Sequence, residues 1–227
     1  QMGIEILYGP EYQTGIWDWL KENGSEISYA YLNRPHIATK YIDYIKDHTD
    51  IKVIYYGHDL HFLRERREYE LTGDIQKKRE SDYWKSVEFT LMYKADISYY
   101  PSYIERDAIH QIDQSIRVKA ITAYVYEEFL KNINKDFARR EGLLFVGGFA
   151  HPPNADAVLW FAREIYPRIR EKAEIPFYIV GSRVTDEIRA LQEPGNGITV
   201  YGFVSDEELA RLYASSRLVV VPLRYGA

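Results

Sequence analysis

Short apolar runs alternate with helical patterns along this chain, and that alternation constrains its fold more than any other feature. The expected strands lie at residues 4–8, 27–32, 51–56, 97–100, 116–120, 143–148, 176–181, 197–202 and 217–223. The expected helices lie at residues 12–22, 36–48, 64–95, 102–111, 152–172 and 205–216. Strands that are separated by helices usually pair in parallel, with the helices on the faces of the sheet. The sequence therefore predicts an α/β protein with mainly parallel sheets.

The strand pattern is interrupted by a polar stretch, residues 121–141, which contains NINKDFARRE. We interpret this stretch as a linker between two domains, residues 1–138 and residues 139–227. After it the alternation of strands and helices restarts more regularly. We therefore expect two Rossmann-like domains, each with its own sheet.

Several local signals place the helix ends. Gly73 and Asp74 are expected to break the longest helical stretch, and Asn154 is a candidate N-cap for the helix that follows it. Ser205 and Glu208 have the spacing of a capping box. Between the positions of Arg64 and Glu80 the charges alternate in sign, which is typical of a solvated helix face.

Composition argues against several classes of protein. The formal net charge of −5 and the pI of 5.7 argue against nucleic-acid binding, which usually needs a basic domain. The absence of cysteine excludes a disulfide scaffold and thiol catalysis. No apolar run approaches the length of about 18 residues needed to span a membrane, and the start, QMGIEILYG, lacks the pattern of a signal peptide. We expect a cytoplasmic protein. Its 21 tyrosines suit stacking on sugars or nucleotides, but half-buried packing is the favoured interpretation.

Glycine ends three of the four expected strands of the second domain, at Gly147-Gly148, Gly181 and Gly202. Glycine at the carboxyl end of a strand lets a ligand approach the backbone closely. The N-terminus of the following helix then offers free N–H groups to a phosphate. Ordinary tight turns would give the same pattern, so both interpretations stay open.

The stretch VIYYGHDLHFLRERREYE, residues 53–70, joins a strand to a cluster of charges. His58, Asp59 and His61 follow Gly57 at the carboxyl edge of the expected sheet, where ligands bind in α/β proteins. Two imidazoles and a carboxylate could ligate zinc. On an extended segment, however, His58 and His61 would point to opposite faces, and the other histidines are scattered. We therefore predict no metal site, and we expect Asp59 to cap the next helix and His61 to be structural.

The second domain contains, in this order, LLFVGGFAHPPNADAVLWFAREIYPRIRE, PFYIVGS and ITVYGFVSDEELARLYASSRLVVVPLRYGA. Taken together, these segments resemble the nucleotide-binding domain of family 4 glycosyltransferases. In the first domain, YYGHDLHFLRERRE and LNRPHIA are similar to segments of bacterial members that build surface polysaccharides. The resemblance implies a GT-B fold, in which two Rossmann-like domains face each other across a cleft. It also implies a metal-independent transfer that needs no cofactor and retains the anomeric configuration of a nucleotide-sugar.

The same resemblance implies roles for individual residues. His58 matches a histidine that reaches the donor sugar, with Asp59, His61 and His151 as possible supporting residues. The implied donor-binding residues are Gly147, Gly148, Ser182, Arg183, Gly202, Phe203, Val204 and Arg224. Most members carry a basic pair just after the double glycine, whereas this chain has Phe149-Ala150-His151, which leaves its phosphate partner open.

The resemblance also implies an incomplete enzyme. Members continue beyond the final RYGA into a Glu-x₇-Glu pattern, and they begin before the first strand expected here. We therefore expect a middle fragment that is inactive alone and has exposed sheet edges. The expected partners are a nucleotide-sugar and a glycan or lipid-linked acceptor, with peripheral contact to the inner face of the membrane possible through Arg64, Arg66 and Arg67. The alternative is a catalytically dead GT-B module that serves as a binding scaffold. A dinucleotide-binding enzyme is disfavoured because GGFAHPP lacks the G-x-G-x-x-G spacing.

Overall fold

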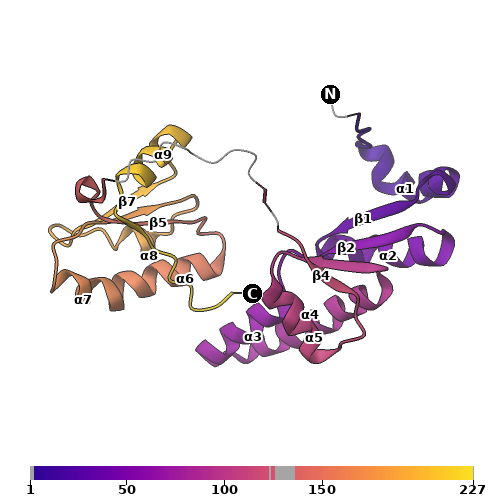
Figure 1. The fold of residues 1–227 in the computed structure, drawn as a ribbon, viewed down its shortest axis with the longest axis horizontal. Helices are drawn as coiled ribbons and strands as arrows, with labels where there is room; N and C mark the ends of the chain where they lie inside the picture. The colour runs from indigo at the N-terminus through magenta and orange to yellow at the C-terminus, as the bar shows by residue number, and fades with distance from the viewer. Residues whose placement is uncertain (1–2, 123, 126–135, 227) are drawn as a thin grey trace. The chain divides into compact units, whose positions relative to one another are not determined.

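The computed structural model describes residues 3–122, 124, 125 and 136–226, and the chain divides into two compact units (Figure 1). Unit 1 comprises residues 1–126 and unit 2 comprises residues 127–226. Each contains a four-stranded sheet of parallel strands, which confirms the predicted fold class. The boundary predicted between residues 138 and 139 falls in a 3₁₀ turn of unit 2, Phe137–Arg139.

The sheet of unit 1 has the strand order β1–β2–β3–β4. These strands are Tyr29–Asn33, Lys52–Tyr56, Ile97–Tyr100 and Val118–Ala120. Side chains alternate between the two faces along a strand, and paired residues of parallel strands share a face. Leu32, Tyr55 and Val118 therefore point to one side, where they are buried.

Helices cover that buried face of the sheet (Figure 1). Helix α1 (Pro10–Asn23) and the 3₁₀ turn η1 (Gly24–Glu26) precede β1. Helix α2 (Pro35–His48) follows β1, α4 (Ile75–Lys94) precedes β3, and α5 (Tyr103–Ile112) follows β3. Their buried side chains complete the core of unit 1: Ala38, Ile42, Ile45, Phe89, Leu91, Met92 and Ile109.

The predicted break in the longest helical stretch is confirmed. Helix α3 (His61–Thr72) ends at Gly73, whose φ of 74° is left-handed, and α4 begins immediately after Asp74. The Asp74 carboxylate accepts the Gln76 backbone N–H at 2.8 Å, as an N-cap does. Two sequence signals, glycine and aspartate, thus divide one helical stretch into a helix pair.

The strand predicted at residues 4–8 is wrong. Residues 3–8 are neither helix nor strand, and the side chains of Ile4, Ile6 and Tyr8 are 68%, 73% and 78% exposed. A strand is stable only when a neighbour completes its hydrogen bonds. The apolar pattern of this segment alone therefore does not create a strand.

The sheet of unit 2 has the strand order β7–β6–β5–β8. These strands are Ile198–Gly202, Phe177–Val180, Leu143–Val146 and Leu218–Val219. Its two faces are both covered. Helix α6 (Pro152–Trp160) packs Ala157 and Val158 on one face, and α9 (Asp206–Ser215) packs Leu212 against Leu144 on the other. The strand predicted over residues 217–223 pairs only at its start, where Leu218 and Val219 lie beside Leu143 and Leu144 of β5.

The long helix predicted over residues 152–172 is present with an internal irregularity. After α6 the chain forms a π-helical turn, Phe161–Ile165, and continues as α7 (Tyr166–Arg170). Pro167 lacks the N–H that would bond one turn back, which accounts for the break in the α-helical ladder. Asn154 is not the N-cap of α6 as predicted. His151 takes that position, and the Asn154 amide donates instead to the Gly148 carbonyl at 3.0 Å.

Helix α8 (Asp186–Arg189) completes unit 2 with one short turn after β6. None of the described helices combines the length and apolar composition needed to cross a lipid bilayer.

Candidate functional site

Three non-glycine residues in the described part of the chain have a left-handed backbone, and all three follow a strand. Arg34 (φ 68°) follows β1, His58 (φ 68°) follows β2, and Arg183 (φ 59°) follows β6. This conformation is strained for a residue with a side chain, and such strain collects at functional sites. It marks the carboxyl edges of both sheets, where α/β proteins bind ligands.

His58 lies at the edge of unit 1 among polar and aromatic neighbours. Its Nε2 atom is paired with the Asn33 side-chain oxygen, and its ring meets the Tyr56 ring edge-on at 4.6 Å. Partial burial, followed by the positive charge of Arg34, lowers the pKa of His58 below its usual 6.5. The imidazole is therefore neutral at pH 7 and can exchange hydrogen bonds with a ligand.

A hollow of about 550 Å³ opens beside His58 on the face of the sheet opposite the helices. Paired strand residues Tyr31 and Ile54 share this face with Tyr99, and Tyr31 is 58% exposed. Aromatic rings with one wet edge suit stacking on sugar rings. The lining is completed by Tyr56, Ile121, Thr122 and Tyr124.

Gly57 brings the main chain close to the core just before His58. A Cβ atom on Gly57 would lie 2.2 Å from the fully buried Tyr100 ring, so only glycine fits. Its N–H donates to the Tyr99 carbonyl at 3.1 Å, which continues the sheet's hydrogen bonding to the start of the turn.

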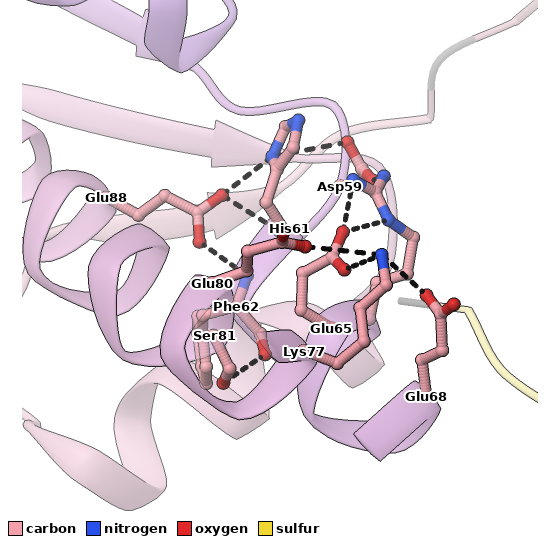
Figure 2. Close-up of polar contacts among 10 residues, drawn as sticks. Asp59, His61, Phe62, Glu65, Glu68, Lys77, Glu80, Ser81 and Glu88 are labelled. Atoms are coloured by element: carbon pink, nitrogen blue, oxygen red, sulfur yellow. Dashed lines mark hydrogen bonds and ion pairs between the residues drawn. The ribbon is translucent and has the colours of Figure 1, made fainter. Parts of the chain in front are cut away.

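The contacts of Asp59 differ from the prediction, whereas those of His61 agree with it. Asp59 does not cap α3. Its carboxylate accepts from Arg64 at 2.6 Å, while the start of α3 is held by Glu88 of α4 (Figure 2). Glu88 also accepts from His61 Nδ1 at 2.9 Å. The structural role predicted for His61 agrees with these contacts, since its ring also stacks on Trp84 at 4.8 Å.

The charges of α3 and α4 do not all form the solvated face that the sequence predicted. Lys77 of α4 contacts the carboxylates of Glu65, Glu68 and Glu80 at 2.9, 3.2 and 3.2 Å (Figure 2). Glu65 is buried. Burial would raise the pKa of Glu65, but hydrogen bonds from Lys77 and Arg64 outweigh it and the pKa falls. Sequence alternation could not show which charges face the other helix.

In unit 2 the glycines that end the strands approach one another. Gly181 needs to be glycine because a Cβ atom there would lie 1.7 Å from the Gly147 carbonyl oxygen. A Cβ atom on Gly148 would meet only the Ser182 hydroxyl, at 3.5 Å. Tight backbone contact and open space thus lie side by side in these turns. A hollow of about 220 Å³ lies here, lined by Gly147, Gly148, Gly181, Ser182, Phe203, Val204 and Asp206, with Val146, Val180 and Leu209.

The predicted donor-binding residues divide into two groups. Gly147, Gly148, Ser182, Phe203 and Val204 line the hollow, and Phe203 is 82% exposed beside it. Gly202 precedes Phe203 with a φ of 74°, which turns the chain at the end of β7. His151 and Arg183 are exposed on loops of the same unit and are not among the lining residues.

Arg224 lies in a third place within unit 2. It forms a two-bonded ion pair with Asp156 of α6, including an Nε bond of 2.8 Å, and its guanidinium lies 5.6 Å from the centre of the Trp160 ring. The predicted contact of Arg224 with donor phosphate stays a prediction, and this ion pair competes with it.

Sequence analysis missed Asn33, Arg34, Tyr31 and Glu88. Asn33 and Arg34 could have been found, since they end a predicted parallel strand beside the one that ends at His58. Glu88 gives no such signal, because its partners lie 26 and 27 positions away in the chain. Among the described residues, no three histidine, aspartate or glutamate side chains are placed to hold a metal ion. That the reaction needs no metal stays a prediction.

Comparison with known proteins relates unit 2 to a family model and both units to solved structures. Residues 140–227 match the family model described as "Glycosyl transferases group 1". Over 91 residues the chain is 29% identical to an uncharacterized 44.6 kDa protein in the cps region of Klebsiella pneumoniae, and the match covers 37% of this chain and 24% of that protein.

Solved structures match both units. TarM superposes with a TM-score of 0.65 at 13% identity, covering 92% of this chain and 39% of that one. The pneumococcal O-GlcNAc transferase GtfA, solved with UDP and GlcNAc, gives 0.58 at 15% identity, covering 95% of this chain and 41% of that one. A trehalose 6-phosphate synthase from Burkholderia multivorans gives 0.58 at 11% identity, with coverages of 97% and 58%. The chain therefore spans less than two thirds of each of these relatives. It has the GT-B fold of these solved structures, and its residues 140–227 match the glycosyltransferase group 1 model.

Proposed function

We propose that this chain is part of a retaining glycosyltransferase that moves a sugar from a nucleotide-sugar to a glycan or glycoconjugate acceptor. The observation that carries the proposal is the match of residues 140–227 to glycosyltransferase group 1. The same residues form the glycine-lined hollow of unit 2. The GtfA structure with UDP supports a nucleotide-sugar donor, and the relative in a cps region supports a role in surface polysaccharide assembly.

Unit 2 is the proposed donor site. Backbone N–H groups at Gly147 and Gly148 would face the diphosphate, since a glycine turn before a helix N-terminus suits phosphate. The exposed ring of Phe203 offers a surface to the nucleobase. Because Phe149-Ala150-His151 replaces a basic pair, we expect these backbone groups to carry more of the phosphate binding than cationic side chains do.

Unit 1 is the proposed acceptor side, and His58 is the proposed group that contacts the donor sugar. A neutral imidazole that is held in place can bond a sugar hydroxyl and favour an oxocarbenium-like transition state without reorganising. The tyrosine-lined hollow beside it is the proposed place for an acceptor sugar. We propose that no metal or cofactor takes part, and that the reaction occurs in the cytoplasm.

The first experiment is thermal unfolding of the intact enzyme, of which this chain is proposed to be a part, with UDP, GDP, CDP and dTDP in turn. A nucleotide at 100 times its dissociation constant should stabilise the fold by about 2.7 kcal/mol. A shift with one nucleotide only would support the transferase and identify the donor class. If none shifts the transition at millimolar concentration, the scaffold alternative, a GT-B module without catalysis, replaces this proposal.

Gly148→Ala sharpens that experiment. Its new methyl group meets only Ser182 at 3.5 Å, so the fold should be kept, but it occupies space that a diphosphate needs. We expect nucleotide affinity to fall at least tenfold. Gly15→Ala is the matched control, because a Cβ atom there, in α1 of unit 1, meets nothing within 4 Å. An unchanged affinity in Gly148→Ala would remove this loop from the donor site.

His58→Ala in the intact enzyme tests the catalytic role. Turnover should fall steeply with little change in nucleotide affinity, because the imidazole is proposed to act on the sugar and not on the nucleotide. A large loss of nucleotide binding would contradict this assignment.

A further inference from the structure

The carboxylate of Glu88 is fully buried, and it contacts His61, which lies three positions after His58 in the chain. It lies on α4 and accepts three hydrogen bonds at the start of α3 (Figure 2). His61 N–H donates at 2.9 Å, Phe62 N–H at 3.2 Å, and His61 Nδ1 at 2.9 Å. A buried charge is costly unless several donors satisfy it. These three donors account for its place in the core.

Glu88 supplies what α3 lacks in its own sequence. The N-cap position of α3 is Leu60, whose side chain has no acceptor for the first N–H groups of the helix. The carboxylate of Glu88 accepts from these N–H groups instead, although Glu88 lies 27 positions after His61 in the chain. One oxygen of Glu88 lies at hydrogen-bond distance from both the His61 N–H and His61 Nδ1, and we assign the ring proton to Nδ1, which makes both contacts donors to that oxygen. The first N–H groups of α3 are thus capped by a side chain of α4 and not by the helix's own N-cap residue.

The turn between β2 and α3 is held at both ends. At one end, Gly57 N–H bonds to the Tyr99 carbonyl of β3 at 3.1 Å. At the other end, Glu88 holds His61, and Leu60 between them is fully buried. His58 lies inside this short span with its left-handed φ of 68°. A strained backbone persists only where the surroundings determine it.

We propose that Glu88 is a positioning residue for His58. By anchoring the first turn of α3, it keeps His58 left-handed and keeps its imidazole beside Asn33 and Tyr56. Glu88 does not touch a ligand. The inference rests on the proposed function for the role of His58, but the geometry it predicts exists without any nucleotide or sugar.

The test is nuclear magnetic resonance of the full chain with labelled histidine, in the absence of nucleotide. Glu88→Gln keeps the size of the side chain but places an amide N–H₂ against a backbone N–H. We expect the His58 ring and Cα signals to shift or broaden, and His61 to lose its fixed Nδ1–H tautomer. The His58→Gln spectrum assigns the His58 signals among the six histidines.

Two controls separate positioning from general destabilisation. Glu80→Gln removes a carboxylate from the same helix that contacts only Lys77 among the residues of Figure 2. Ile42→Val loosens the core of unit 1 at a distance from the turn. Both should leave the His58 signals in place. If Glu88→Gln also leaves them in place, or if the controls move them equally, the proposal is overturned.

If Glu88→Gln does not fold, His61→Phe decides. It keeps the backbone bonds and the ring stacking on Trp84, but removes the Nδ1 donor. A smaller shift of the His58 signals supports the proposal, and unchanged signals overturn it. Failure of the proposed function would appear separately, as absence of nucleotide binding.

Discussion

The two units end their strands in opposite ways. In unit 1 the carboxyl edge carries side chains, and Asn33, His58 and Asp59 are each paired with a partner from another element or turn. In unit 2 the corresponding edge is main chain, with Gly147, Gly148 and open space. Unit 1 is built to hold side chains in one orientation, whereas unit 2 is built to let a ligand reach the backbone.

The sheets differ in the same sense. Unit 2 has packed helices on both faces of its sheet. Unit 1 has its core on one face, and the other face carries exposed Tyr29 and Tyr31. Parallel sheets usually have both faces covered. The open aromatic face is therefore a feature of unit 1 alone, next to its candidate site.

The largest expected effect comes from the glycine that each unit needs at a strand end. Gly181→Ala would press a methyl group onto the Gly147 carbonyl, and Gly57→Ala would press one onto the Tyr100 ring. Both should cost about 3 kcal/mol or more of unfolding free energy. Urea unfolding of each variant measures this.

The two clashes should respond differently to a second mutation. Adding Tyr100→Leu to Gly57→Ala removes the ring, so the combined loss should be at least about 1 kcal/mol smaller than the sum of the two single losses. Gly181→Ala meets backbone, so no side-chain change can relieve it. Strict additivity for Gly57 and Tyr100 would show that the ring does not fix this turn.

Acid should affect unit 1 through Glu65. Its folded pKa lies below the ordinary 4.5, so its stabilisation is present above that value and is lost as pH falls through the folded pKa. Glu65→Gln leaves Lys77 without its closest partner and should lower the free energy of unfolding by about 1.5 kcal/mol at pH 7. Acid should then lower the stability of this variant less than that of the unchanged protein. The measurement is the unfolding midpoint from about pH 6 to pH 3.

Glu70→Gln is the matched control for that measurement. Glu70 pairs with Arg66 on the exposed side of the same helix, where an ion pair contributes about 0.3–0.5 kcal/mol. If Glu65→Gln and Glu70→Gln lose equal unfolding free energy, Glu65 belongs to the solvated face that the alternating charges predicted. The pKa of Glu105 is shifted in the opposite direction from that of Glu65, because burial raises it.

Relief of strain should give a smaller gain. His58→Gly allows the left-handed φ freely, and it should be about 1 kcal/mol more stable than His58→Ala. Arg183→Gly compared with Arg183→Ala is the same test in unit 2. If glycine gives the higher unfolding free energy at both positions, but turnover is lost only at His58, then both sheet edges contain backbone strain and only the strained residue of unit 1 is needed for catalysis.

The sequence predicted those features that depend on neighbouring residues in the chain. The parallel α/β pattern, the break at Gly73-Asp74 and the loops carrying His58 and Gly148 all follow from periodicity, turn residues and the family resemblance. The Ser205 N-cap is present, with its hydroxyl accepting the Glu208 N–H at 3.2 Å. Ser102 and Glu105 form a complete capping box that the same spacing rule could have found.

Predictions failed where the structure of a segment, or the burial of a side chain, depends on contacts that tertiary packing creates. Residues 4–8 have the composition of a strand but no pairing in the structure. Glu65 and Glu88 belong to a charged pattern whose buried members depend on how α3 packs on α4. Asp59 precedes a helix, as caps do, yet Arg64 takes its carboxylate. Such choices depend on tertiary packing, which one sequence does not display.

The smallest expected effect concerns Arg224. Asp156→Asn removes the charge that holds its guanidinium over Trp160, and the pair is partly exposed, so the stability loss should be about 0.5 kcal/mol. If Arg224 meets donor phosphate, its release should tighten nucleotide binding about twofold, or about 0.4 kcal/mol.

Arg224→Gln should then weaken binding, whether or not Asp156 is present, because a neutral amide cannot replace a guanidinium on phosphate. Fluorescence of Trp160 reports the local change, and calorimetric titration gives the affinity. If Asp156→Asn leaves the affinity unchanged and Arg224→Gln lowers only stability, the arginine is a structural partner of α6. Phosphate binding in unit 2 would then depend on glycine backbone alone, which would make its contrast with the side-chain edge of unit 1 complete.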